Sequence, residues 1–573
     1  MSYLADVFAG GRGNLGFNRG DLKKDLLPSG LIIAVSLALF IAASGSYGLQ
    51  EPDEAFLPQV AREMAESGKI FSPTYLDESS PESGLPAVWC MVVTASVTGW
   101  SEWGVRLAGA LACVLGLLFL YWSVSRLSDR LVGLAAALIL ATSPQYYGLA
   151  QSATPHPFIA MAVTGAMGAV LLGLDHIVKW KVAASLAALF STLAFALSGP
   201  QAVLIMAMSL LLLAIGLFFD SSRYRLDMLK SIGKSAGLGA AIFIPLCALV
   251  ILVLWQANDS TFIREFTGSA WFDQMFGNPT KMTKRVEYYV RGAAYAGFPW
   301  SSLLPLALFA LAGKGIAGKE TERSRHGLFL VLFFAAGIIL LTAESARHYP
   351  YLLLVLPACA ASIALGLRTI QQTWDSRSIR VGVFLSFLLF LVCRKDFSKY
   401  GLEYLFETFG QTLEFPDDFT WSGKYLHLSL VFWLVALALL FIMPRHRWIF
   451  LAPLMCGLVI AACGSWFVIP GAGNLNSPKA AVEKYREETS GEPLYAYRKI
   501  TPGLMFYGRQ DVISIRTKLT PVLKDAREDK RFFVIVAQRD YRSFNLRIRH
   551  ITRRKPLRVL CEGKGGYWLV SNQ

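Results

Sequence analysis

Charged residues are scarce in this chain, and the patterns that usually mark a soluble enzyme are missing. Of its 573 residues only 17% are charged, whereas 54% are hydrophobic. The eight cysteines include no pair spaced as C-x-x-C, so neither a zinc knuckle nor a disulfide framework is indicated. No small-residue cleavage site follows the first apolar run, so we expect the segment 30–48 to stay as a membrane anchor. Together these absences exclude a soluble enzyme.

Long apolar runs dominate the first 470 positions instead. Runs of about 18 or more apolar residues predict transmembrane helices, so the fold class is a polytopic α-helical membrane protein. The net charge of +15 suggests nucleic-acid binding, but Lys and Arg lie between the apolar runs, where they orient a membrane protein. We therefore exclude nucleic acid as a partner. We predict thirteen transmembrane helices, at 30–48, 104–124, 131–147, 157–175, 182–197, 201–219, 236–256, 297–313, 327–342, 349–367, 380–393, 425–443 and 448–467.

Composition divides the chain into parts that lie on different sides of the membrane. The basic N-terminal tail, 1–29, is predicted to be cytoplasmic. The transmembrane domain, 30–469, carries an outer loop at 50–103. Residues 470–573 alternate β-rich and helical runs, which predicts a soluble α/β domain on the periplasmic face. Its basic run at 539–558 is either a solvated face or a surface for anionic headgroups.

Within the outer loop, 85–99 is interpreted as an interfacial helix. It is short and ends at Trp100, a residue type that favours the headgroup level. If it were counted as a span, every later basic cluster would lie on the outer side of the membrane, against the preference of basic residues for the cytoplasmic side.

The acidic stretch from Leu49 to Trp89 follows the first span directly. Its residues Asp53–Ser67 predict an amphipathic helix, because Phe56, Val60 and Met64 recur every four positions and Gly68 provides a stop. Acidic residues at the mouth of a membrane span often lie near a substrate, an ion or a metal. Asp53 is therefore the first candidate for a functional residue.

Other polar residues gather at the predicted outer membrane face. A carboxylate there can act as a general base toward a hydroxyl acceptor, and arginines can hold a phosphate leaving group. A divalent metal bound by Asp53, Glu54 and His156 is a further alternative. Taken singly, each arginine is also explained as a headgroup anchor. The candidates are Asp53 and Glu54 for catalysis; Arg264, Arg285, Arg347 and Tyr349 for a donor phosphate; and Glu82, Arg62, Arg106 and His348 as further residues of the site.

Several motifs resemble the polyprenyl-phosphate-dependent glycosyltransferases of the GT-C fold. The segment 52–68, with Pro-Asp-Glu and then Ala-Arg62-Glu-Met and Ser-Gly, resembles the first outer loop of the aminoarabinose transferases and of the wider protein mannosyltransferase-like superfamily. Gly104-Val105-Arg106 resembles the start of the next span in that family. The resemblance implies an inverting transfer of one sugar from a polyprenyl-phosphate carrier at the outer leaflet of a bacterial inner membrane. It also implies that Asp53 is the catalytic or metal-linked residue.

The chain departs from the aminoarabinose transferases at three charged positions. It has Glu82-Ser83-Gly84-Leu85 where they have E-K-P-P, His156 where they have an Asp, and Ser198 where they have a Lys. The donor sugar and the acceptor, whether lipid, glycan or protein, therefore stay open. Two alternatives to a transferase remain: a catalytically altered relative that acts as a binding or scaffold protein, and a transporter of lipid-linked glycans.

Overall fold

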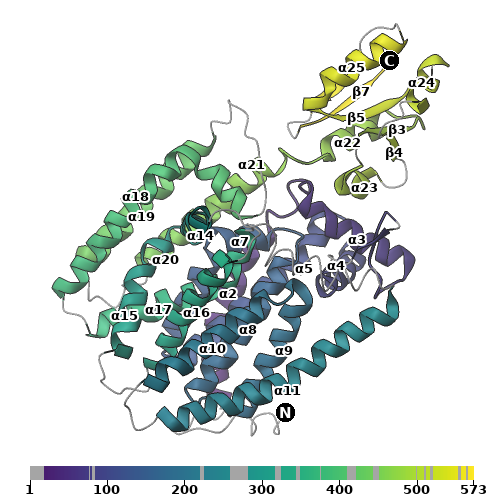
Figure 1. Ribbon diagram of the computed structural model, residues 1–573. Coiled ribbons are helices and arrows are strands. Elements are labelled where there is room, and N and C mark those ends of the chain that lie inside the picture. Colours follow the sequence, from purple (N-terminus) through teal and green to yellow (C-terminus); the bar gives the residue numbers. More distant parts are fainter. Residues whose placement is uncertain are drawn as a thin grey trace.

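The computed structural model describes residues 19–76, 78–80, 84–219, 225–258, 282–316, 324–343, 349–373, 376–409, 421–442, 451–498, 500–508, 512–515, 520–528, 530–552, 557–562 and 566–572. Within these ranges the chain forms a long helical body with a small α/β region attached at one end (Figure 1). The predicted mostly helical membrane fold is confirmed. The number of thirteen spans and the domain boundary at 470 stay predictions.

The body consists of helices that follow the predicted apolar runs closely. Among the described residues, seven helices are long and apolar enough to cross a membrane. The body contains α2 (Arg19–Ser36), η1 (Leu37–Ile41), α5 (Glu102–Leu127), α6 (Arg130–Ala141), α7 (Pro144–Ala150), α8 (His156–Leu174), α9 (Trp180–Ser198), α10 (Gln201–Phe219), α11 (Arg225–Ala257), α14 (Met282–Ala296), η4 (Trp300–Ser302), α15 (Leu304–Ile316), α16 (Ser324–Ala343), η5 (Tyr349–Leu354), α17 (Leu356–Thr373), α18 (Ser376–Thr408), α19 (Trp421–Ile442), α20 (Leu451–Cys463), η6 (Gly464–Val468) and α21 (Ile469–Gly473).

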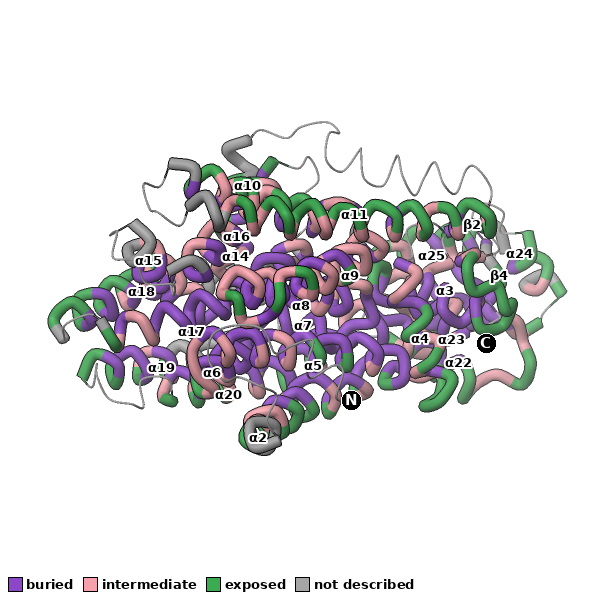
Figure 2. The backbone as a smooth tube through the Cα atoms, turned by 90° about the horizontal axis from the view of Figure 1, so that it is seen from below, coloured by how far each residue is buried: buried purple, intermediate pink, exposed green. Residues whose placement is uncertain are grey.

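Helices α5 and α8 form the centre of the body, where Figure 2 shows a continuous buried layer. Small residues let the two helices approach closely, as in other membrane proteins. A Cβ added to Gly168 would lie 2.3 Å from Ser123 Oγ, and one added to Gly109 would lie 3.1 Å from Pro157 Cγ. The apolar part of α8 is 78% buried, whereas that of α11 is only 11% buried. We infer that α11 faces lipid and that α8 belongs to the core.

Several predicted spans differ from the helices that the structure contains. The span 380–393 lies within the longer helix α18, which continues to Thr408. The span 131–147 is divided between α6 and α7, because Pro144 disfavours the helical conformation at Ser143, which is extended. The spans 297–313 and 349–367 each begin with a 3₁₀ segment, η4 and η5, before the α-helix starts. The first span ends at Ile41 rather than at residue 48. The irregular segments lie beside the candidate site described below.

The predicted amphipathic helix of the outer loop is confirmed. Helix α3 (Asp53–Ser67) ends at Gly68, which has a positive φ of 71° and donates its N–H to the Met64 carbonyl. After a short hairpin, β1 (Thr74–Tyr75) and β2 (Glu78–Ser79), comes α4 (Leu85–Thr98). With 14 residues, α4 is about 21 Å long, less than the roughly 30 Å of a bilayer core. This length favours the interfacial interpretation over a further span.

The C-terminal region contains a mixed five-stranded sheet in the order β4-β3-β5-β7-β6. Strands β3, β4 and β5 are parallel, and β7 pairs antiparallel with β5 and β6. All five strands lie within the region, 470–573, where alternating β-rich and helical runs were predicted. The elements are α22 (Lys479–Glu488), β3 (Leu494–Tyr497), α23 (Pro502–Gly508), β4 (Val512–Ile515), α24 (Thr520–Arg527), β5 (Phe533–Ala537), α25 (Gln538–Thr552), β6 (Arg558–Glu562) and β7 (Tyr567–Ser571).

Alternation along β5 explains why helices cover both faces of this sheet. Val534 and Val536 pack into one buried cluster with Phe544 of α25, whereas Phe533 and Ile535 pack into another with residues of α22. The basic run at 539–558 thus includes an amphipathic helix. Its apolar stripe was obscured in the sequence by the arginines that surround it.

Candidate functional site

The first turn of α3 places two neighbouring carboxylates in different environments. The Asp53 side chain is exposed, whereas Glu54 is only 2% exposed. Among the described residues, no hydrogen bond or ion pair involves the Asp53 carboxylate. The surrounding protein still removes part of its hydration, and this desolvation raises the pKa of Asp53 above its ordinary value. Asp53 is thus the carboxylate available for chemistry.

Glu54 is bound in a buried ion pair with Arg106 of α5. Arg106 donates from Nε to Glu54 Oε1 at 2.7 Å and from Nη2 to Oε2 at 3.0 Å, which is a bidentate arrangement. The backbone N–H groups of Gln50 and Ala153 donate to the same carboxylate at 3.0 and 3.2 Å. Each Glu54 oxygen therefore accepts two hydrogen bonds.

The remaining donors of Arg106 bind the segment that precedes α3. They reach the carbonyl oxygens of Ser44, Tyr47 and Gly48, and the guanidinium lies 3.9 Å from the centre of the Tyr47 ring. Arg106 itself is fully buried. Glu54 and Arg106 were predicted as a catalytic residue and its neighbour, but their contacts indicate a supporting role. They fix the start of α3, and through it the position of Asp53.

A divalent metal at Asp53, Glu54 and His156 does not fit this geometry. A metal at Glu54 would have to displace hydrogen bonds from Arg106 or from the backbone. Within the described ranges, no group of three or more His, Cys, Asp or Glu side chains is arranged to hold a metal ion. We therefore derive no step of the reaction through a metal.

The turn before α8 brings His156 near the start of α3. Ala153 of this turn donates to Glu54, and three residues later His156 begins α8. The His156 ring packs edge-on against Tyr351 of η5, with 6.1 Å between ring centroids. Segments near residues 54, 156 and 351 are thus neighbours.

The loop before α4 also reaches this turn. Gly84 has a positive φ of 58°, and a Cβ added there would lie 3.3 Å from Pro155 Cβ and 3.7 Å from the Leu197 carbonyl oxygen. The positions of departure from the aminoarabinose transferases, at 83, 156 and 198, each adjoin one of these three residues. The described neighbours of these positions, Gly84, Pro155 and Leu197, are therefore close together.

The other predicted site residues form no hydrogen bond or ion pair with Asp53 in the part of the chain that the structure describes. Arg62 lies on α3 but points to the C-terminal region, where its Nη1 binds the Phe506 carbonyl and its guanidinium lies 4.6 Å from the Phe506 ring centre. Arg285 belongs to α14 and Tyr349 to η5, two segments in contact with each other. Outside the described residues lie Glu82, Arg264, Arg347 and His348.

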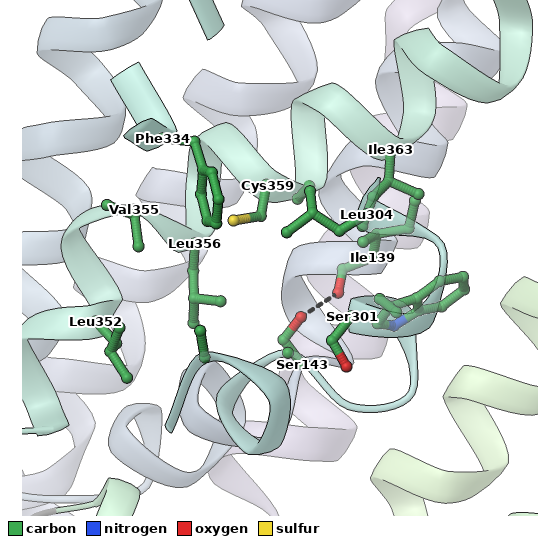
Figure 3. Close-up of a pocket in the computed structure, with 14 residues that line it drawn as sticks. Ile139, Ser143, Ser301, Leu304, Phe334, Leu352, Val355, Leu356, Cys359 and Ile363 are labelled. Carbon is green, nitrogen blue, oxygen red and sulfur yellow. Dashed lines mark hydrogen bonds between the residues drawn. The ribbon is translucent and has the colours of Figure 1, made fainter. Parts of the chain in front are cut away.

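A small apolar pocket with a cavity volume of about 20 Å³ lies between these segments and the core (Figure 3). The end of α14, η4, η5 and α17 supply most of its wall, and Leu352, Leu356 and Cys359 are drawn around it. Its few polar groups include Ser143, whose hydroxyl is bonded to the Ile139 carbonyl at 2.8 Å. The sequence did not predict this pocket, because its lining comes from four separate stretches of the chain, 139–143, 293–304, Phe334 and 352–363.

Comparisons with known proteins agree with the predicted resemblance. The family model for dolichyl-phosphate-mannose-protein mannosyltransferases matches residues 83–255. An undecaprenyl phosphate-α-4-amino-4-deoxy-L-arabinose arabinosyl transferase of Pectobacterium carotovorum is 22% identical over 63% of this chain and 62% of its own length. A Pseudomonas aeruginosa protein of the same name is 27% identical over 48% of this chain and 49% of its own length. The chain thus matches about three fifths or less of the length of these relatives.

Solved structures show the same fold over nearly the whole chain. ArnT from Cupriavidus metallidurans, bound to undecaprenyl phosphate, superimposes with a TM-score of 0.71 at 16% identity, covering 96% of this chain and 98% of that one. The chain is thus similar in sequence and in fold to the GT-C glycosyltransferases of the aminoarabinose transferase type. The archaeal oligosaccharyltransferase AglB of Archaeoglobus fulgidus matches more distantly, with a TM-score of 0.51 at 11% identity over 93% of this chain and 71% of that one. The relatives and the apolar helices indicate a bacterial inner-membrane protein.

Proposed function

We propose that this protein is an inverting membrane glycosyltransferase that moves one sugar from a polyprenyl-phosphate donor to a lipid, glycan or protein of the cell envelope, at the periplasmic face of the inner membrane. The observation that carries the proposal is the start of α3. There the Asp53 side chain is exposed, next to Glu54, whose two carboxylate oxygens are bound in the buried ion pair with Arg106. The names of the relatives, which are transferases with undecaprenyl-phosphate donors, support it.

In this reaction Asp53 acts as the general base. Its carboxylate takes the proton of the acceptor hydroxyl while the acceptor oxygen forms a bond to C1 of the sugar. The bond from C1 to the phosphate oxygen breaks on the opposite face, and the polyprenyl phosphate leaves with the electron pair. A carboxylate whose pKa is raised by desolvation is a better base than an ordinary one.

The donor phosphate is proposed to lie near α14 and η5. Arg285 and Tyr349 belong to these two contacting segments, and Arg264 and Arg347 are the further candidates. Arginine suits the site because its planar guanidinium binds phosphate oxygens in pairs.

Replacing Asp53 by Asn tests the catalytic role. We expect Asp53→Asn to lower the transfer rate by about 100-fold or more, since a positioned base contributes about 10²–10⁴-fold. The matched control is Glu66→Gln, which removes an exposed carboxylate from the same helix. Transfer from undecaprenyl phosphate-linked aminoarabinose to envelope acceptors measures the outcome. Full activity of Asp53→Asn in the folded protein would contradict the mechanism.

Carrier binding separates the transferase from the alternatives. Native mass spectrometry of the detergent-purified protein should detect bound undecaprenyl phosphate, and Arg347→Ala should weaken it. Arg380→Ala, on an exposed position of α18, serves as the control. Binding without any transfer by the wild type would favour the scaffold or transporter alternative. Failure to bind added carrier would contradict both the donor and the phosphate site.

A further inference from the structure

The segment that leads into Asp53 has no regular secondary structure of its own. Residues Leu49 and Gln50 lie between the end of the first membrane helix and the turn that opens α3. Their backbone N–H groups are nevertheless buried, and a buried N–H needs a partner. The partners therefore determine where Asp53 sits.

Three of the four consecutive N–H groups at 48–51 are bound by the C-terminal part of the chain. Gly48 donates to Asn474 Oδ1 at 3.1 Å, Leu49 to the Tyr507 hydroxyl at 2.7 Å, and Glu51 to the Asn476 carbonyl at 3.0 Å. The fourth, from Gln50, goes to Glu54. The backbone before Asp53 is thus held mainly by residues more than 400 positions away.

Tyr507 of α23 connects this segment to α5 as well. Its hydroxyl accepts from Leu49 and donates to Glu102 Oε1 at 3.0 Å, and Glu102 also pairs with Lys479 at 2.8 Å. Glu102 lies one helical turn before Arg106, the residue that holds Glu54. The same face of α5 therefore anchors both sides of the Asp53 segment.

Close packing reinforces these hydrogen bonds. Gly503 of α23 donates its N–H to Glu51 Oε1 at 2.6 Å, and a Cβ added to Gly503 would lie 2.5 Å from that oxygen. A Cβ added to Gly48 would lie 2.2 Å from Ser477 Oγ. Figure 1 shows α23 against α3 at the junction between the body and the α/β region. A side chain at either glycine would therefore collide with the opposite segment.

We propose that α23 and residues 474–479 form a positioning element for Asp53, with Tyr507 as its central positioning residue. The C-terminal α/β region is then a working part of the transferase, not an appendage with a separate task. This inference rests on the proposed function, because it assigns Tyr507 an effect on the reaction through Asp53. A displacement of about 1 Å at a reacting group costs about 100-fold in rate, so small losses of contact are measurable.

Tyr507→Phe in the full-length protein tests the inference. This variant keeps the ring but removes the hydroxyl that joins Leu49 to Glu102. The matched control is Tyr485→Phe, which removes a hydroxyl bonded to the Glu492 carbonyl within the C-terminal region. Asn476→Ala, which removes the side-chain amide bonded to the Glu51 carbonyl, provides a second variant should Tyr507→Phe fold poorly.

Two readouts are needed. With undecaprenyl phosphate-linked aminoarabinose as donor, we expect Tyr507→Phe to lower kcat about tenfold or more, with the donor KM changed by less than about twofold. Hydrogen exchange of residues 48–57 should accelerate in Tyr507→Phe and Asn476→Ala but not in Tyr485→Phe.

The outcomes separate this inference from the proposed function. A wild type that transfers no sugar contradicts the proposed function, and exchange alone then decides whether the junction holds the segment. An active wild type with an equally active Tyr507→Phe overturns the positioning role. Unchanged exchange at 48–57 in both variants overturns the junction itself.

Discussion

Glu54 and Arg106 illustrate what a buried ion pair does at the scale of single residues. Burying two charges costs several kcal/mol, which is offset here by a bidentate contact and by backbone partners for the remaining atoms. The pair adds little net stability by itself. Removing one partner, however, leaves the other charge buried and uncompensated.

We therefore predict that Glu54→Gln destabilises the protein by about 3–5 kcal/mol, the usual cost of breaking a buried pair. The thermal midpoint in detergent should fall clearly, whereas Glu66→Gln, an exposed change in the same helix, should leave it unchanged. Equal midpoints for the two variants would show that the pair does not support the site.

The proposed role of Asp53 as the general base predicts that the reaction rate depends on pH. The base must be deprotonated, and desolvation raises the pKa of Asp53 above its ordinary value near 4. The rate should therefore fall as the pH drops through this raised pKa, so the acid limb of kcat/KM lies at a higher pH than for an unperturbed Asp. The measurement is kcat/KM of the wild type between about pH 4 and 8. A flat profile down to about pH 4 would exclude Asp53 as the base.

The sequence made Asp53 the first candidate but did not predict that Glu54 is bound in a buried ion pair. Asp53 and Glu54 are neighbours with the same chemistry, and the helical spacing that predicts α3 says nothing about their partners. Arg106 and Ala153, which bind Glu54, lie 52 and 99 positions further along the chain. Their approach depends on the packing of α5 and α8, so the separate roles become visible only in the folded protein.

At the scale of elements, close helix contacts depend on glycine. A Cβ added to Gly366 of α17 would lie 2.7 Å from the Cα of Ala307 in α15, whereas Gly216 of α10 has nothing within 4 Å. We predict that Gly366→Ala destabilises the protein by about 1–3 kcal/mol through overpacking. Gly216→Ala should be neutral or stabilising by up to about 1 kcal/mol, because alanine favours helix. Thermal midpoints of the two variants check this, and a smaller loss for Gly366→Ala than for Gly216→Ala would contradict it.

Hydropathy predicts where the helices lie but not where they break. Most predicted spans coincide with single helices, because each is a continuous apolar run that must satisfy its backbone internally. The breaks at Ser143, η4 and η5 fall inside equally apolar runs. They depend on local proline geometry and on neighbours from other segments. These breaks line the pocket and the outer turns, so the functional region is also the least predictable part.

At the scale of the whole molecule, helix α5 relates the two ends of the chain. Its 26 residues extend about 39 Å, enough to cross a bilayer core of about 30 Å. At one end Arg126 pairs with Asp25 at 3.3 Å, close to the N-terminal tail. At the other end Glu102 binds Tyr507 and Lys479 of the C-terminal part. We therefore expect the start of α2 and the C-terminal region to lie on opposite faces of the membrane.

The positions of the basic residues indicate which end of α5 is cytoplasmic. Arg126, Arg130 and Arg368 gather at the Asp25 end of α5, and positive residues favour the cytoplasmic side. We predict that alkaline phosphatase fused after Gln573 is active and that a fluorescent protein fused there is dark, because the fusion point is periplasmic. A fluorescent protein fused before Met1 should be bright. The reverse pattern would place Asp53 on the cytoplasmic side, where the proposed outer-leaflet transfer does not occur. Bright fluorescence at both ends would contradict the opposite placement of the two ends that α5 implies.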